Sequence, residues 1–253
     1  MTVAVALVNP PREGLAASEL VETTDLSPDE GVALAEAVLA DFFEIMAETN
    51  VDLLINYPAA EDLPVGHRTG DPEGEIRAVA SGVLDDDSLE SVRFEVQVGS
   101  SRAARAGNAI THLLRDEEET SAALIDHRVP LLERSVVDEA AIKLRRSETV
   151  IGPAADGEFF FAGFRDPIDF TDLFADVPIR TVVDRSIAEG HAVDFVRRRE
   201  VLTHPRDLRT VVSLLRSRRA ANRRVPDHTM RAVDELGLRV VDGELGIGEG
   251  DNR

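Results

Sequence analysis

The most informative run of this chain is Val150-Ile151-Gly152-Pro153-Ala154-Ala155-Asp156-Gly157-Glu158-Phe159-Phe160-Phe161-Ala162-Gly163-Phe164. It predicts a buried strand, a Gly-Pro turn, an acidic loop and a second apolar strand. The run from Phe159 to Phe161 suits a strand that is covered on both faces. Asp156 and Gly157 are typical of a hairpin turn. Alternatively, they put a carboxylate at a strand end, where ligands bind in open α/β sheets.

The N-terminal sequence predicts that the sheet is mostly parallel. Residues 3–8 are apolar and suit a strand that ends at Asn9-Pro10-Pro11. Ser27 is a capping residue for a helix over residues 28–49, and residues 51–56 suit the next strand. A strand, a long helix and a second strand form a βαβ unit, which favours a parallel sheet.

The remaining apolar runs extend this alternation of helices and strands. We expect further strands over residues 92–98, 122–125, 191–196 and 237–241. We expect further helices over residues 75–84, 100–114, 133–146, 181–189 and 227–236. The sequence therefore predicts an α/β protein.

The composition is that of a globular protein with a substantial core. The chain has 253 residues, of which 43% are hydrophobic, enough for one large α/β domain or two small ones. It contains no cysteine, which excludes disulfides and cysteine-based zinc sites. The apolar N-terminus is too short for a signal peptide, and no apolar run approaches the ~20 residues that span a bilayer. We therefore expect a soluble, cytoplasmic protein.

The chain is strongly acidic, with a formal net charge of −20. Lys143 is the only lysine, so the other counted bases are arginines. An excess of acids with almost no lysine suits a protein dissolved at high salt, where repulsion between like charges is screened. A halophilic cytosol is the favoured interpretation, and an acidic protein from a mesophile is the alternative. In the first case the acidity reflects the solvent and not a binding partner.

The segment from Gly152 to Gly157 resembles the G-P-x-x-D-G-G-Y-Y-L-I-G signature of a family of glycosyltransferase-like proteins. Members of that family are also named rSAM/selenodomain-associated transferases. Glu158 replaces the second glycine of the signature, and phenylalanines replace its tyrosines. The resemblance covers most of residues 3–215 and suggests a divergent member of haloarchaeal type. It implies a GT-A-like nucleotide-diphospho-sugar transferase fold, in which a three-layer, Rossmann-like, mostly parallel sheet is flanked by helices.

The resemblance also implies where a substrate binds. Residues 11–20 align with a family loop, P-x-x-G-K-x-K-T-R-L, whose cations suit phosphates, but Leu15, Ala17 and Glu19 replace three of these cations. Arg12 is the substrate-binding candidate that this segment keeps, and Asn9, at the end of the preceding strand, is another. Further candidates come from other family motifs: Gln97, Arg105, Gly152 and Gly157. For Arg105 a solvent-exposed helical arginine is the alternative interpretation.

Arg128 occupies the position of the family's metal-binding aspartate in a D-x-P motif. An arginine cannot ligate Mg²⁺ or Mn²⁺, which need oxygen donors. One hypothesis is that Asp126 and Asp156 hold the metal instead. A second is that Arg128 supplies the positive charge and the protein is independent of metal. A third is that the site has lost its chemistry.

Two functions follow from the resemblance. The first is glycosyl or nucleotidyl transfer from a nucleotide sugar or nucleoside diphosphate, with Asp156 and Arg128 as catalytic residues in a divergent, impaired site. The second is a non-catalytic family member that serves as a ligand-binding or regulatory module. Whether the chain is an enzyme is left open by the sequence.

The C-terminal sequence predicts an extension of the transferase-like domain. We expect the domain over residues 1–215, a helical extension over residues 216–241 and a disordered tail over residues 242–253. Five arginines between Arg216 and Arg224 suit RNA, an acidic surface or a phosphate-bearing partner. Because no aromatic residue accompanies them for base stacking, a solvent-exposed helix end is favoured and nucleic-acid binding is not expected.

Overall fold

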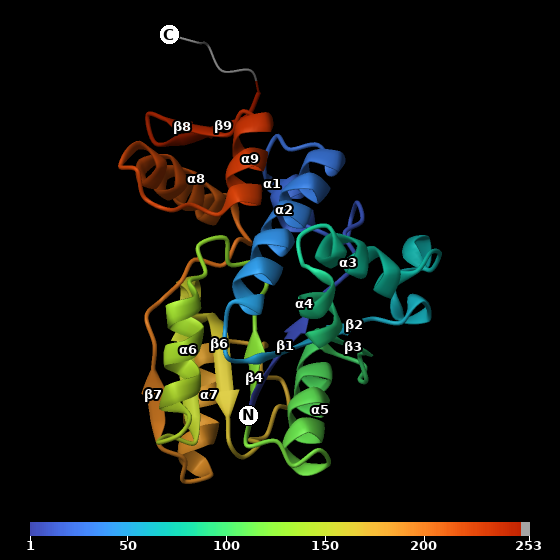
Figure 1. Ribbon diagram of the computed structural model, residues 1–253, viewed down its shortest axis with the longest axis vertical. Helices are drawn as coiled ribbons and strands as arrows, with labels where there is room; N and C mark the ends of the chain where they lie inside the picture. Colours follow the sequence, from blue (N-terminus) through green and yellow to red (C-terminus); the bar gives the residue numbers. More distant parts are fainter. Residues whose placement is uncertain (249–253) are drawn as a thin grey trace.

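The computed structural model describes residues 1–248, and its centre is a seven-stranded sheet with the order β3-β2-β1-β4-β6-β5-β7 (Figure 1). The strands are β1 (Thr2–Leu7), β2 (Asp52–Tyr57), β3 (Arg93–Val96), β4 (Ser121–Ile125), β5 (Thr149–Pro153), β6 (Phe159–Phe164) and β7 (Val193–Phe195). Within this sheet β6 runs antiparallel to its neighbours β4 and β5, and the other strand pairs are parallel. The prediction of a mostly parallel α/β sheet is therefore confirmed.

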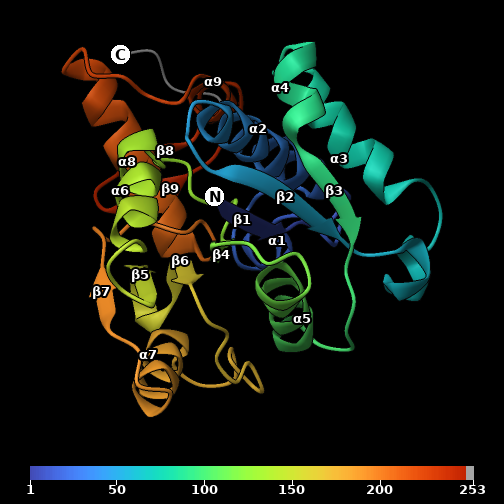
Figure 2. The same cartoon turned by 60° about the horizontal axis from the view of Figure 1, so that its bottom comes forward.

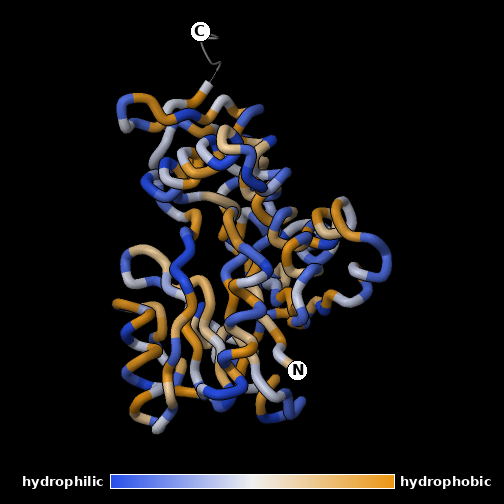
Figure 3. The backbone as a smooth tube through the Cα atoms, turned by 60° about the vertical axis from the view of Figure 1, so that its left-hand side comes forward, coloured by the Kyte–Doolittle hydropathy of each residue, from blue (hydrophilic) through white to orange (hydrophobic). Residues whose placement is uncertain are grey.

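Helices cover both faces of the sheet, which gives the three predicted layers (Figure 2). They are α1 (Ser18–Thr23), α2 (Pro28–Ala47), α3 (Pro72–Ser81), α4 (Asp86–Ser91), α5 (Arg102–Arg115), α6 (Arg134–Lys143), α7 (Pro178–Ala188), α8 (Pro205–Ala220) and α9 (Asp227–Glu235). One core contains Phe42 of α2, Ile76 of α3 and Val136 of α6. A second core contains Ile110 of α5 and Val182 of α7. Hydrophobic and hydrophilic segments alternate along the outer helices in Figure 3, as expected for amphipathic helices.

Helix α2 begins where the sequence predicts, because its first turn is capped. The Ser27 side chain accepts a hydrogen bond from the backbone N–H of Glu30 (3.3 Å), and the Glu30 carboxylate accepts one from the N–H of Ser27 (2.7 Å). Pro28 occupies the first helical turn, where a missing N–H costs nothing. This reciprocal capping box satisfies two N–H groups that the helix leaves free.

Strands β5 and β6 form the hairpin that the opening stretch predicts. They pair in antiparallel register and are joined by one 3-10 turn, Ala155–Gly157. Asp156 and Gly157 have φ angles of 53° and 79°, the left-handed backbone that Asp-Gly pairs tolerate. Phe160 packs into one core and Phe159 into the other. The strand is therefore covered on both faces, and the hairpin interpretation of Asp156-Gly157 is confirmed.

The C-terminal residues build a third core at one end of the sheet. Leu208 of α8, Val233 of α9 and Leu238 pack with Leu20 of α1 and Leu34 of α2. The predicted boundary at residue 215 therefore falls inside α8, whose residues share a core with the N-terminal helices. The predicted disorder from residue 242 is wrong in part, because Glu244–Gly246 forms strand β9 and pairs with β8 (Arg239–Val241). The rest of that prediction, residues 249–253, lies outside the described residues.

Arginines of the C-terminal cluster form intramolecular contacts. Arg216 donates two hydrogen bonds to the carbonyl oxygen of Leu238 (3.0 and 2.6 Å). Arg218 forms an ion pair with Glu133 (3.2 Å), and Arg219 forms one with Asp234. The favoured interpretation as a merely solvent-exposed helix end is therefore incomplete, because these side chains tie α8 to α9 and to the residues directly before α6 and β8.

Among the helices of residues 1–248, none combines the length and the apolar character needed to cross a bilayer.

The third core yields a prediction about stability. Leu208→Ala should lower the free energy of unfolding by about 2–5 kcal/mol, because it removes a fully buried side chain. Leu214 is on the same helix but 40% exposed, so Leu214→Ala should change that free energy by less than about 1 kcal/mol. Unfolding in denaturant measures both variants. Equal losses would contradict the assignment of α8 to a buried core.

Candidate functional site

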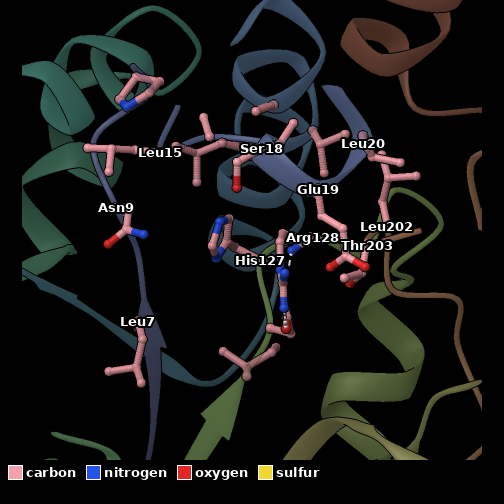
Figure 4. Close-up of a pocket in the computed structure, with 18 of the residues that line it drawn as sticks. Leu7, Asn9, Leu15, Ser18, Glu19, Leu20, His127, Arg128, Leu202 and Thr203 are labelled. Carbon is pink, nitrogen blue, oxygen red and sulfur yellow. Dashed lines mark hydrogen bonds and ion pairs between the residues drawn. The ribbon is translucent and has the colours of Figure 1, made fainter. Parts of the chain in front are cut away.

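A cavity of about 340 Å³ lies at the carboxyl ends of β1 and β4 (Figure 4). The sheet continues from β1 through β2 to β3 on one side and to β4 on the other. Such a point, where the strand order reverses, is the usual ligand site of open α/β sheets. Asn9 follows β1, His127 follows β4, and Thr203 precedes α8 at the cavity wall.

The wall formed by α1, α2 and the preceding loop is largely apolar. Leu15 and Ala17 line it at two positions where the resembled family has lysines. Leu34 and Val38 of α2 extend the same wall, and Leu202 closes it from the C-terminal side. This part of the cavity therefore suits an uncharged portion of a ligand.

The charged part of the cavity is centred on Asp126, the residue directly after β4. Its side chain is 10% exposed and accepts hydrogen bonds from Nε (3.0 Å) and Nη2 (2.7 Å) of Arg128. It also accepts one from the Arg128 backbone N–H (2.9 Å). A second guanidinium, that of Arg102 at the start of α5, lies 3.7 Å from the same carboxylate. Two cations therefore converge on one buried anion.

This convergence fixes the charge states at the centre. Burial acts to raise the pKa of Asp126, but attraction by Arg128 and its hydrogen bonds outweigh burial and hold that pKa well below its usual range. Attraction by Asp126 in turn raises the pKa of Arg128. Asp126 and Arg128 are therefore both charged at neutral pH, and both oxygens of the Asp126 carboxylate are hydrogen-bonded to Arg128.

His127 lies between these two residues and faces the cavity (Figure 4). Burial lowers the pKa of its imidazole to about 4, so the ring is neutral at pH 7. Its edge packs against Phe42, with the ring centroids 6.4 Å apart. His127 is not among the sequence-predicted site residues, because the histidines of the chain show no spacing typical of metal ligands. The signal that was available is its place directly after a buried strand and beside Asp126.

Two further predicted charged site residues, Arg12 and Asp156, are engaged in ion pairs. Arg12 donates two hydrogen bonds of 2.7 Å to the Glu75 carboxylate and lies outside the cavity lining. Asp156 also lies outside the cavity lining, pairs with Arg206 of α8 and is about half exposed. Neither side chain is therefore available to a ligand unless its ion pair opens.

Gln97 and Arg105 hold the loop between β3 and α5. The Gln97 amide donates to the carbonyl of Asn56 (2.7 Å), and Arg105 Nε donates to the carbonyl of Gly99 (3.0 Å). Both lie outside the cavity lining. Of the predicted substrate-binding side chains, Asn9 is the one that lines the cavity.

At Gly152 and Gly157, the two predicted site glycines, close packing leaves no room for a Cβ atom. A Cβ at Gly152 would lie 2.4 Å from the Phe160 ring, and one at Gly157 would lie 2.5 Å from Val177. Gly157 also has a positive φ of 79°, which side chains disfavour. Their substrate-binding role stays a prediction.

The environment of Asp126 does not fit a divalent cation. Both of its oxygens accept from Arg128, and Arg102 adds a second positive charge nearby. Within residues 1–248, the side chains grouped closely enough to hold a metal are Asp41, Glu44 and His228, which lie on α2 and α9. The assignment of Asp126 and Asp156 as metal ligands stays a prediction without geometric support.

Residues 72–181 match the model of a family described as an uncharacterized protein conserved in bacteria, DUF2064. No curated protein matched the sequence. Among solved structures, a protein from Desulfovibrio desulfuricans G20, provisionally named a nucleotide-diphospho-sugar transferase, superposes with a TM-score of 0.73. The two chains are 19% identical, and the match covers 93% of this chain and 95% of the other. The chain therefore has the nucleotide-diphospho-sugar transferase fold that the sequence predicts.

Two further structures are more distant. A cytidylyltransferase from Leptospira borgpetersenii serovar Hardjo-bovis strain JB197 has a TM-score of 0.49 and 9% identity, with 92% of this chain and 94% of the other covered. Rv0371C from Mycobacterium tuberculosis H37Rv, solved in complex with manganese, has a TM-score of 0.41 and 14% identity, with 80% of this chain and 91% of the other covered.

The neutral state of His127 yields a prediction about pH. The pKa of His127 is about 4 in the folded protein and returns to the ordinary 6.5 on unfolding. Between these two pH values the imidazole is protonated in the unfolded chain but not in the native protein. The free energy of unfolding of the wild type, relative to His127→Gln, should therefore fall as pH decreases from about 6.5 to about 4. Denaturant unfolding at several pH values measures this difference.

His112 supplies a control of opposite sign. A hydrogen bond to Asp116 raises its pKa above 6.5, so the stability it contributes is complete below 6.5 and is lost as pH rises through the folded pKa. The wild type should thus gain stability relative to His112→Gln on acidification. A His127→Gln difference that stays constant below pH 6.5 would show that the imidazole is not buried as described.

Proposed function

We propose that the cavity at the ends of β1 and β4 binds a nucleotide or nucleotide sugar and that the protein transfers a glycosyl or nucleotidyl group. The observation that carries this proposal is the convergence of Arg102 and Arg128 on Asp126 at the end of β4. The fold and the size of the cavity support it. The neighbouring apolar wall suits a base or sugar ring.

The two arginines suit the charge that such a transfer develops. When a nucleoside diphosphate departs, negative charge grows on its phosphate oxygens, and fixed cations stabilise that charge. Arg128 uses Nε and Nη2 for Asp126, which leaves Nη1 available to an oxygen of the ligand. Arg102 is 53% exposed and offers a second fork-shaped donor. In this scheme Asp126 positions Arg128 and takes no part in the chemistry.

The proposal needs no divalent cation. In related chemistry a metal ion supplies the positive charge beside the phosphates. Here the Arg128 guanidinium occupies the carboxylate that would hold such an ion. Binding should therefore be as strong with a chelator as with Mn²⁺.

Asp156 is proposed to orient the acceptor hydroxyl. It follows β5 in the hairpin turn and faces Arg206 at the start of α8. Both partners are about half exposed, so water screens the attraction between them. Separating Asp156 from Arg206 when an acceptor binds therefore costs little free energy.

A second candidate function is a binding or regulatory module without catalysis. Glu19 lines the cavity and places a carboxylate where the resembled family has an arginine. It would repel a phosphate, although it pairs with His204. The ion pair of Arg12 with Glu75 also favours the non-catalytic module, because it leaves this arginine unavailable to a phosphate.

Ligand binding tests the proposal through thermal unfolding in molar KCl. Nucleoside diphosphates and nucleotide sugars are screened with a chelator and with Mn²⁺. At least one ligand should raise the melting temperature by mass action in both conditions. Arg102→Gln should reduce this shift, because it removes a cavity cation whose nearest acidic partner is 3.7 Å away.

Arg165→Gln is the matched control. Arg165 follows β6 at the opposite end of that strand from the hairpin turn, pairs loosely with Glu148 (3.9 Å) and should leave the shift unchanged. A shift that appears only with Mn²⁺ would contradict the metal-independent site. A panel in which no ligand raises the melting temperature would contradict nucleotide binding altogether.

Turnover separates the two candidate functions. With the ligand identified by melting, Asp156→Asn should lower the rate of transfer by roughly 10²–10⁴-fold while the ligand-induced melting shift persists. Mass spectrometry of the reaction products measures the rate. Binding without any product across a panel of acceptors would favour the non-catalytic module.

A further inference from the structure

A cluster of metal-ligating side chains lies between α2 and α9, away from the candidate active site. Asp41 and Glu44 are three residues apart on α2, so they project from one face of the helix. His228 lies in the first turn of α9. One ligand atom from each of the three residues lies within 4.8 Å of the others. The two helices pack side by side in both views (Figures 1 and 2).

Asp41 is held in a fixed orientation by its hydrogen bonds. Its Oδ2 accepts from the N–H of Thr229 (2.7 Å) and from the Thr229 hydroxyl, and its Oδ1 accepts from the N–H of His228 (3.1 Å). These bonds use two sites on Oδ2 and one on Oδ1, so Oδ1 retains a lone pair for another partner. Hydrogen bonds that orient a carboxylate in this way are typical of the outer shell of a metal site.

The other two ligands are joined by a long hydrogen bond, at a separation that a shared cation would also produce. His228 Nε2 and Glu44 Oε1 are 3.4 Å apart, beyond the usual 2.7–3.2 Å of an N–H···O bond. Two atoms bound tetrahedrally to one Zn²⁺, each at about 2.0–2.2 Å, lie about 3.3–3.5 Å from one another. The observed separation falls inside that interval.

The cluster is also accessible to solvent. His228 lines a groove between α2, α3 and α9, together with Glu36 and Arg231. The His228 and Glu44 side chains are 23% and 42% exposed. A metal ion can therefore enter from the groove, and water can complete its coordination.

We infer that Asp41, Glu44 and His228 form a binding site for a divalent transition metal such as Zn²⁺. One imidazole nitrogen with two carboxylate oxygens suits Zn²⁺ better than Mg²⁺, which takes oxygen ligands alone. The bound ion links α9 to α2. It thereby stabilises the packing of the third core against α2, the helix that lines the candidate active-site cavity. This inference is independent of the proposed transferase function.

Metal binding by the full-length protein tests the inference directly. Metal-free protein is titrated with Zn²⁺ in a calorimeter, and Co²⁺ absorption in the visible range reports tetrahedral coordination. The wild type should bind one Zn²⁺ and show an intense Co²⁺ spectrum, whereas Mg²⁺ should give no comparable signal. Zn²⁺ should also raise the melting temperature, because it binds the folded state alone.

Glu44→Gln and His228→Gln should each weaken Zn²⁺ binding by at least about tenfold. Both keep a polar side chain of similar size, so folding is retained without metal. Glu36→Gln, on the same helix and lining the same groove, is the control and should bind Zn²⁺ like the wild type.

Two results would overturn the site. One is no stoichiometric Zn²⁺ binding by the wild type at about 0.1 mM free metal. The other is binding that neither Glu44→Gln nor His228→Gln weakens relative to Glu36→Gln. Asp41→Asn would not separate metal binding from folding. The Asp41 carboxylate also caps α9, and losing this cap lowers stability by itself.

Discussion

The antiparallel pairing of β6 with β4 and β5 is the constraint on which the site depends. The hairpin returns the chain between two parallel strands, and the N–H of Asp126 donates to the carbonyl of Phe160 (2.8 Å). That bond continues the ladder one residue past β4 and fixes the direction in which the chain leaves the sheet. Asp126, His127 and Arg128 are therefore presented to the cavity by regular secondary structure. Sites supported on strands are held more precisely than sites on free loops.

The charge arrangement at the end of β4 follows from this placement. A carboxylate that is nine-tenths buried is costly unless it is paired and hydrogen-bonded, and Arg128 meets both requirements. The same pair holds the Arg128 guanidinium at the wall of the cavity, beside the point where we propose that a phosphate binds. The segment before α8 and the start of α8 contact this part of the structure. The N–H of Leu202 donates to the carbonyl of Arg128 (2.7 Å), and the Arg206 guanidinium forms an ion pair with Asp156. Cavity and C-terminal core are thus parts of one packed structure.

The sequence predicts the fold well because the signals are local. The Ser27 capping box and the Asp156-Gly157 turn each depend on a few neighbouring residues. The site is harder to predict because its partners are distant in sequence. Arg12 is a plausible phosphate contact until Glu75, 63 positions later, is found to hold it. Likewise, the contact of Asp41 with Thr229 joins residues 188 positions apart, and no local pattern indicates it.

In the proposed function, arginines take the place of a divalent metal beside the phosphates of a bound nucleotide. The most direct test is a crystal structure of the protein grown with a nucleoside diphosphate and Mn²⁺, with anomalous diffraction data collected for manganese. We expect the diphosphate to lie against Arg102 and Arg128, with the Asp126–Arg128 ion pair intact and no anomalous peak at Asp126. A manganese peak ligated by Asp126, with the Arg128 guanidinium displaced, would contradict the proposal.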